Sequence, residues 1–337
     1  MKKYLIFTSI IISMFLILLV FLYAKLYSYA NTPADNRNIP THVVVKSGQP
    51  FATTLKKLYN KKLIVNPRLF KIYAKLYSYE SKIKAGEYLL SPNMPPEKIL
   101  SVMVSGKVRL YKLIVPEGYN IYQIGELVEE SGFAIKNEFV RVAKDKFFLK
   151  SKNIDADSFE GYLFPDTYHF SKSADSRKII SKMVSKFNLV FNNGWEKRAK
   201  EIGFTKHQVV ILASIIEKET GAAFERPLIS SVFHNRLKKR MRLETDPTVI
   251  YGIKDFDGNI KKKHLRQYTP YNTYKIKGLP YGPISNPGSK SIYATLFPAN
   301  TKFLYFVSKK DTTHKFSTNI KDHNSAVRKY QLRRRKR

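Results

Sequence analysis

Two glutamates stand at the end of an otherwise apolar segment, ILASIIEKETG at residues 211–221. Removal from water raises the pKa of a carboxyl group, and a carboxyl that keeps its proton near neutral pH can act as a general acid. Residues two apart on a helix point about 200° apart, so Glu217 and Glu219 cannot work as a close carboxylate pair. Each glutamate therefore either does chemistry separately or forms an ordinary ion pair. The basic partners considered for such a pair are Arg226, Arg236 and Arg242.

The neighbouring residues predict that this segment is a helix over about 206–220. Thr205 followed by Gln208 fits a capping box, and Gly221 fits the residue just beyond a helix C-terminus. At about 100° per residue the apolar side chains surround the helix axis, which is the pattern of a helix buried on most sides. These side chains are Val209, Val210, Ile211, Leu212, Ala213, Ile215 and Ile216. The last turn, with both glutamates, is then expected at the edge of the core.

Other catalytic classes find little support in the residues. There are no cysteines, which rules out disulfides and thiolate metal sites. The seven histidines form no HExxH motif and no short-spaced pair. Ser214 lacks a GxSxG setting, and no phosphate-binding GxxxxGK(S/T) loop is present. Metal catalysis therefore fits this sequence poorly.

The N-terminus predicts a membrane anchor over residues 4–24, which carry no charge. At about 1.5 Å per residue such a helix spans roughly 30 Å, the thickness of a hydrocarbon core. A cleaved signal peptide is the alternative, but its apolar core is usually only about 7 to 15 residues long. Lys2 and Lys3 outweigh Lys25 on the far flank, so residues 1–3 are expected on the cytoplasmic side. Residues 25–40, with two prolines, are expected to be a linker.

Residues 41–107 predict a small α/β module. The β-branched run near Val43 gives way at Ser47-Gly48 to helical spacing, and Asn66 is placed to cap a second helix that begins at Pro67. GEYLL at 86–90 indicates a returning strand, and a short helix follows. This strand, helix, helix, strand order resembles the LysM-type carbohydrate-binding module. A plain α/β packing module is the alternative.

The rest of the chain is mainly helical. Residues 108–156 are expected to form a connecting α/β region, and helical patterns dominate at about 173–220 and 224–239. A segment rich in Pro, Gly and Tyr occupies about 264–288. LYFVS and HKFST, on either side of KKDTT, predict a hairpin before a last helix and the basic tail at 333–337.

The formal net charge of +34 raises the question of nucleic-acid binding. The basic residues are spread along the chain, no nucleic-acid-binding motif accompanies them, and a membrane anchor argues against such a partner. Attraction to anionic lipid headgroups or to an acidic envelope polymer explains the charge equally well. No nucleic-acid partner is therefore expected.

Six segments occur in an order that resembles the endolytic murein transglycosylase family (MltG or YceG-like). They are FEGYLFPDTY, ILASIIEKET, ER with SVFHNRL, MRLETDPTVIYG, YNTYKIKGLPYGPISNPG, and LYFVS with HKFSTN. The resemblance covers about residues 41–330. One departure is Gly278-Leu279-Pro280-Tyr281-Gly282, where the family commonly has GLPPG; this difference concerns the detail of the sugar subsites.

This resemblance implies a fold of class α+β: an N-terminal transmembrane helix, a LysM-like α/β subdomain at 41–107, and a mainly helical catalytic domain at 157–332 with short strands and a hairpin. It implies an enzyme of the inner (plasma) membrane, with its catalytic domain on the outer, periplasmic side. Such enzymes cut the MurNAc-GlcNAc bond within peptidoglycan strands and leave 1,6-anhydroMurNAc ends, and action on nascent strands as a terminase is expected. Peptidoglycan synthases are possible partners, and no cofactor is expected. A non-catalytic peptidoglycan-binding scaffold is the alternative function.

The family's catalytic glutamate falls on Glu217, which leaves Glu219 a supporting role. One carboxyl can suffice, because the C6 hydroxyl of the sugar replaces water as the attacking group. Glu244 or Asp246 is the candidate if a second carboxylate assists. Further candidates for substrate binding or support of the site are Glu225, Asn235, Arg236, Thr245, Tyr251, Tyr271, Asn272, Tyr274 and Tyr281.

Overall fold

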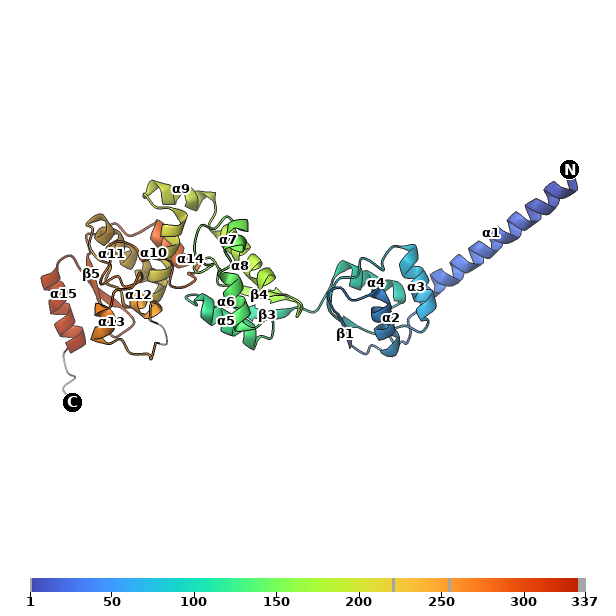
Figure 1. Ribbon diagram of the computed structural model, residues 1–337, viewed down its shortest axis with the longest axis horizontal. Helices are drawn as coiled ribbons and strands as arrows, with labels where there is room; N and C mark the ends of the chain where they lie inside the picture. Colours follow the sequence, from blue (N-terminus) through green and yellow to red (C-terminus); the bar gives the residue numbers. More distant parts are fainter. Residues whose placement is uncertain (1, 220–221, 254–255, 333–337) are drawn as a thin grey trace. The chain divides into compact units, whose positions relative to one another are not determined.

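The computed structural model describes residues 2–219, 222–253 and 256–332 (Figure 1). The chain divides into two compact units. The first takes in the chain up to Tyr111 together with His169–Ala174, and the second contains Lys112–Tyr168 and the chain from Asp175 onward. Helices dominate, and within the described residues the strands form three two-stranded sheets. The predicted mixture of helices with short strands is confirmed.

The N-terminal helix α1 (Lys2–Asn31) is long and apolar enough from Ile6 onward to cross a membrane. Our predicted linker over 25–40 begins later in the structure, because residues 25–31 continue α1. Ala30 is fully buried and Leu26 is nearly so, both in the core of the first unit, and Tyr29 Oη donates a 2.8 Å bond to the carbonyl of Asn66. The last turns of the apolar helix are therefore part of the first unit.

The first unit is built on two antiparallel strands, β1 (Thr41–Val45) and β2 (Gly86–Leu90), with Thr41 opposite Leu90. Asn66 caps α3 as predicted, since its Oδ1 accepts from the backbone N–H groups of Arg68 and Leu69. Phe70 and Tyr88 are fully buried between the sheet and the helices. The helices are α2 (Phe51–Asn60), α3 (Pro67–Leu76) and α4 (Pro96–Ser105). The strand, helix, helix, strand order is as expected.

The second unit carries most of the helices around α10 (Lys206–Glu219). The predicted hairpin is present as β5 (Tyr305–Ser308) paired with β6 (His314–Ser317). Strands β3 (Tyr111–Ile114) and β4 (Thr167–Phe170) form the remaining sheet, and the division between the two units falls within both strands. The other helices are α5 (Ile121–Glu130), α6 (Lys136–Ala143), α7 (Lys146–Ser151), α8 (Ser176–Val190), α9 (Asn193–Glu201), α11 (Arg226–Lys238), α12 (Asp246–Tyr251), α13 (Lys262–Arg266), α14 (Ser289–Leu296) and α15 (Ile320–Val327), with short turns at Ala223–Glu225 and Arg328–Leu332.

Helix α10 is buried along its length, as its sequence predicts. Every residue from 209 to 216 is buried, against helices that include α11, α12 and α14. The capping box is present: Thr205 N donates to Gln208 Oε1 at 2.8 Å, and Gln208 N donates to Thr205 Oγ1 at 3.2 Å. The expected stop at Gly221 lies outside the described residues. The last turn of α10, which carries Glu217 and Glu219, therefore has a fixed position in the second unit.

Candidate active site

Glu217 lies in the last turn of α10, and its side chain is only 6% exposed. Its Oε1 atom is 3.3 Å from Arg226 Nη2, and its Oε2 atom accepts a 2.9 Å hydrogen bond from the backbone N–H of Gly288. Arg226, at the start of α11, is itself fixed by a 3.1 Å bond from Nε to Ser291 Oγ. The Glu217 carboxyl is thus nearly buried, and two hydrogen-bond donors, from Arg226 and Gly288, are placed to bind it when it is ionised.

A second carboxyl, that of Glu117, reaches the same place. A Cβ atom added to Gly288 would overlap Oε1 and Cδ of Glu117, so a larger residue at position 288 would displace the Glu117 side chain. Burial of part of the Glu117 side chain raises its pKa, and the charge of Glu217 raises it further, while Arg226 and Lys290 act in the opposite direction. Glu117 and Glu217 therefore lie close enough to interact electrostatically.

The loop that carries Glu117 is bonded to the segment that carries Gly288. Gly118 N donates to Asn286 O at 3.0 Å, and Asn286 N and Nδ2 donate to Tyr119 O at 2.8 and 2.9 Å. Gly118 has a φ of +77°, a left-handed conformation that favours glycine. Ser214 of α10 binds the segment that carries Gly288, because its Oγ accepts a hydrogen bond from Ile284 N at 3.0 Å. Both loops are thereby placed relative to α10.

Glu160 is a buried acid that joins these loops to two helices. Its Oε2 accepts from Ile121 N at the start of α5 (3.1 Å) and from Tyr251 Oη of α12 (2.9 Å). Its Oε1 accepts from Asn286 Nδ2 at 2.9 Å. Burial raises the pKa of Glu160 to about 7, although its three donors act against that rise. Through these bonds Glu160 connects the 284–288 segment, which carries Gly288 and binds the Glu117 loop, to α5 and α12.

Glu219 has a different set of partners from Glu217, as the helical spacing predicted. It accepts a hydrogen bond from Thr245 Oγ1, whereas Glu217 contacts Arg226 and Gly288. Burial raises the pKa of Glu219 to about 7, and the nearby charge of Asp246 also acts in that direction. The two glutamates therefore do not form one close pair.

Comparisons with known proteins show the family of this chain. The sequence profile of the YceG-like family matches residues 43–329. The chain belongs to the YceG-like family. This confirms the resemblance seen in the six segments.

Individual relatives match over most of the chain. It is 31% identical over 326 residues to the endolytic murein transglycosylase of Bacillus subtilis (strain 168), covering 92% of this chain and 89% of that protein. It is 28% identical over 313 residues to the protein of the same name from Streptococcus pneumoniae serotype 2 (strain D39), covering 83% of this chain and 56% of that one. A crystal structure of a putative YceG-like protein from Listeria monocytogenes matches with a TM-score of 0.60 and 33% identity, over 85% of this chain and 98% of that chain.

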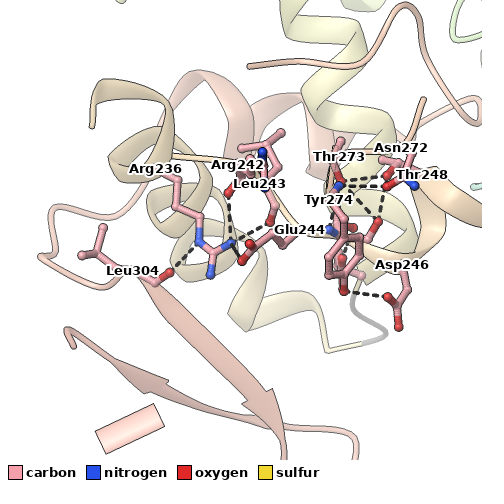
Figure 2. Close-up of polar contacts among 12 residues, drawn as sticks. Arg236, Arg242, Leu243, Glu244, Asp246, Thr248, Asn272, Thr273, Tyr274 and Leu304 are labelled. Carbon is pink, nitrogen blue, oxygen red and sulfur yellow. Dashed lines mark hydrogen bonds and ion pairs between the residues drawn. The ribbon is translucent and has the colours of Figure 1, made fainter. Parts of the chain in front are cut away.

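The predicted second carboxylates of this YceG-like chain lie in two separate polar networks, one with Glu244 before α12 and one with Asp246 at its first residue (Figure 2). Glu244 Oε2 is 3.2 Å from Arg236 Nη1, and Arg236 also donates to the carbonyls of Leu243 (2.8 Å) and Leu304 (2.7 Å). Asp246 Oδ1 accepts a 2.7 Å bond from Tyr274 Oη. Both acids thus have partners of their own, and the structure brings Glu117 to Glu217 instead.

Several other predicted residues have their polar groups bound within the protein. Glu225 accepts from His314 N at 2.9 Å and lies 2.7 Å from His314 Nδ1. Asn235 Nδ2 donates to the carbonyls of Thr301 and Phe303, both at 2.9 Å. Asn272 is buried, with Nδ2 directed at the carbonyls of residues 264, 265 and 267. The contacts of Glu225 and Asn235 fix the hairpin and the segment before it to the beginning and end of α11, and those of Asn272 bind its own segment to the end of α13.

Two of the predicted tyrosines line a cleft of about 720 Å³. Tyr271 and the exposed Tyr281 meet edge to face at 6.2 Å, and His207 from the start of α10 faces the same cleft. Its charged lining residues are Lys146, Lys150, Asp155 and Asp157. Since His207 and Glu217 are ten residues apart on one helix, the cleft lies on the order of 15 Å along α10 from Glu217. The volume is in the range of sites for small ligands.

Sequence reasoning did not single out Glu117 or Glu160. Glu117 stands in the turn VPEGYN, where a strand pattern ends and a helix cap begins, and a polar residue in such a turn is a usable signal. Glu160 stands inside FEGYLFPDTY, where an acid among apolar residues is the signal. Their positions depend on contacts between distant chain segments, because Asn286 is 126 residues from Glu160 and 167 residues from Tyr119 of the Glu117 loop.

Proposed function

We propose that this chain is a membrane-anchored lytic transglycosylase that cuts peptidoglycan glycan strands internally. The observation that carries the proposal is Glu217: a nearly buried carboxyl at the end of a core helix, held by Arg226 and by the N–H of Gly288. Support comes from the alignment along 92% of the chain with a relative named endolytic murein transglycosylase. Glu217 is the proposed catalytic residue.

The proposed reaction needs one acid that later becomes a base. The Glu217 carboxylic acid gives its proton to the glycosidic oxygen between MurNAc and GlcNAc, and the bond from C1 to that oxygen breaks with its electron pair going to the oxygen. The C6 hydroxyl oxygen of the same MurNAc then bonds to C1, and its proton passes to the Glu217 carboxylate. The products are a 1,6-anhydroMurNAc end and a free GlcNAc hydroxyl, so no water is consumed.

Arg226 and the Gly288 N–H are placed to stabilise the Glu217 carboxylate that exists between the two proton transfers. Charge-assisted bonds of this kind are stronger inside a site from which water is excluded. Ordinary glycoside hydrolysis, by contrast, requires a second carboxyl group to activate water or to act as nucleophile. The intramolecular hydroxyl removes that requirement.

The anchor follows from α1. We propose that α1 crosses the inner membrane with its N-terminus in the cytoplasm, since Lys2 and Lys3 outweigh Lys25, and that both units lie on the outer side. Because Leu26 and Ala30 are packed into the first unit, that unit is held at the membrane surface. We also propose that the first unit is a LysM-like glycan-binding module and that the enzyme acts on nascent strands beside peptidoglycan synthases.

The test is mass spectrometry of uncrosslinked glycan strands incubated with the full chain in detergent. Wild type is expected to produce anhydro ends, and Glu217→Gln is expected to produce none. Glu201→Gln, which removes an exposed charge on α9, serves as the matched control and should retain activity. Reducing ends would indicate a hydrolase. Strands left uncut by wild type would favour a non-catalytic scaffold and refute the proposal.

A further inference from the structure

Glu117 is held at a short distance from Glu217. A Cβ on Gly288 would overlap Oε1 and Cδ of Glu117 and lie 2.8 Å from its Cγ, while the Gly288 N–H is 2.9 Å from Glu217 Oε2. With standard backbone dimensions these contacts limit the separation of the two carboxyl groups to roughly 7 Å or less. Glu117 is exposed to solvent, whereas Glu217 is nearly enclosed. Glu117 therefore lies at the open side of the same site.

The position of Glu117 is built into the fold. The adjacent Gly118 packs on the last turn of α10, where a Cβ would lie 3.5 Å from Glu217 Cγ, and Lys218 Nζ donates to Gly118 O at 3.4 Å. On its other side the loop is bonded to Asn286. Glu117 is thus held beside Glu217 by contacts among three chain segments, which are the 116–119 loop, the 284–288 segment and α10.

We propose that Glu117 is the second acidic group of the reaction, an ionised carboxylate that faces the sugar ring and stabilises the positive charge that develops at C1. This inference rests on the proposed transglycosylase function. Two carboxyl groups that flank a glycosidic bond are usually about 5 to 9.5 Å apart. Because the C6 hydroxyl attacks, Glu117 forms no bond and transfers no proton; it acts only through its charge.

The charges around Glu117 make a pH test possible. Three charged groups act on it: Glu217 of α10, Arg226 of α11 and Lys290 of α14. Lys218 of α10 donates to the carbonyl of the adjacent Gly118. A carboxylate that must be ionised produces an acid limb, in which activity falls as the pH drops through its pKa. Since burial and the charge of Glu217 raise the pKa of Glu117, that limb is expected above the usual carboxyl range. Because Glu117 interacts electrostatically with Glu217, the apparent pKa of the acid limb is a property of the two groups together.

The experiment compares full-length Glu117→Gln, Glu117→Asp and wild type on uncrosslinked glycan strands across pH. Glu117→Gln is expected to lower kcat by about 100-fold, with a smaller change in KM, and to lose the acid limb. Glu117→Asp, which restores the charge, should recover part of kcat and the limb. Gly288→Ala should also lower kcat, because its methyl group displaces Glu117. Glu130→Gln, an exposed change on α5, is the control.

The outcomes separate this inference from the function on which it rests. If Glu217→Gln remains active, the proposed function fails first. If Glu217→Gln is inactive while Glu117→Gln keeps the wild-type kcat and pH profile, the role of Glu117 is refuted and the function stands. A uniform loss of activity at every pH, without recovery in Glu117→Asp, would show a purely structural role and also overturn the inference.

Discussion

Replacement of Glu160 by glutamine is expected to change how the stability of the second unit depends on pH. Glu160 is only 2% exposed, and its burial raises its pKa from an ordinary 4.5 to about 7. The folded state therefore binds a proton more tightly than the unfolded chain. The stabilisation this gives is fully present below pH 4.5 and is lost as the pH rises to about 7. At about 1.36 kcal/mol per pH unit the loss amounts to about 3 kcal/mol.

The amide side chain of Glu160→Gln cannot ionise, so the variant should lack this part of the pH dependence. At about pH 5 we expect it to be less stable than wild type by about 1 to 3 kcal/mol, because its amide N–H replaces one of the oxygens that face Asn286, Ile121 and Tyr251. By about pH 8 the wild type has lost about 2 to 3 kcal/mol of this stabilisation, so the variant should then be as stable as the wild type or more stable. Glu219, with a pKa also near 7, leaves a remaining slope in both proteins.

The assay is denaturant unfolding at pH 5, 6, 7 and 8, followed by the fluorescence of Trp195. The chain has a single tryptophan, which lies in α9, so the signal reports the second unit alone. The reasoning is refuted if the difference in unfolding free energy between wild type and Glu160→Gln is constant across this range or grows with pH.

Two further predictions test the support of the site and the anchor. Asn286→Ala should cost about 3 kcal/mol or more, because Leu163 N, Tyr119 O and Glu160 lose partners inside the protein; equal urea midpoints for variant and wild type would contradict this. In the cysteine-free chain reconstituted in vesicles, a fluorophore on Leu76→Cys should be quenched by lipid-borne quenchers more strongly than one on Leu89→Cys of β2, because neighbouring Tyr77 is hydrogen-bonded to Tyr23 of α1. Equal quenching at the two sites would count against this placement.

Local patterns in the sequence predicted what is locally determined. The start of α10 at Lys206 follows from Thr205 and Gln208, which bond each other, and the separate directions of Glu217 and Glu219 follow from helical geometry alone. The meeting of Glu117 with Glu217 could not be predicted in this way. It depends on tertiary hydrogen bonds such as Gly118 N to Asn286 O, between residues that are far apart in the chain.

The type of a side chain was also a poor guide to its direction. Asn272 and Tyr251 are chemically able to bind a sugar, but the protein directs their polar atoms at its own loop carbonyls and at Glu160. The predicted linker began too early because Lys25 ends the uncharged run that marks the anchor. The helix itself continues to Asn31, and Ala30 in its last turn is packed into the first unit.

The hydrogen bonds behind the site connect its stability to its chemistry. Glu160 holds Asn286, Asn286 holds the loop of Glu117, and Glu117 lies beside Glu217. Ionisation of Glu160 above about pH 7 places a charge in this buried network and weakens the unit whose loops position both carboxyls. The basic side of the activity profile should therefore contain a contribution from loop positioning. Because the hydrogen bonds of Glu160 go to Ile121, Tyr251 and Asn286 and not to Glu117 or Glu217, Glu160→Gln should remove that contribution without changing either of those two carboxyl groups.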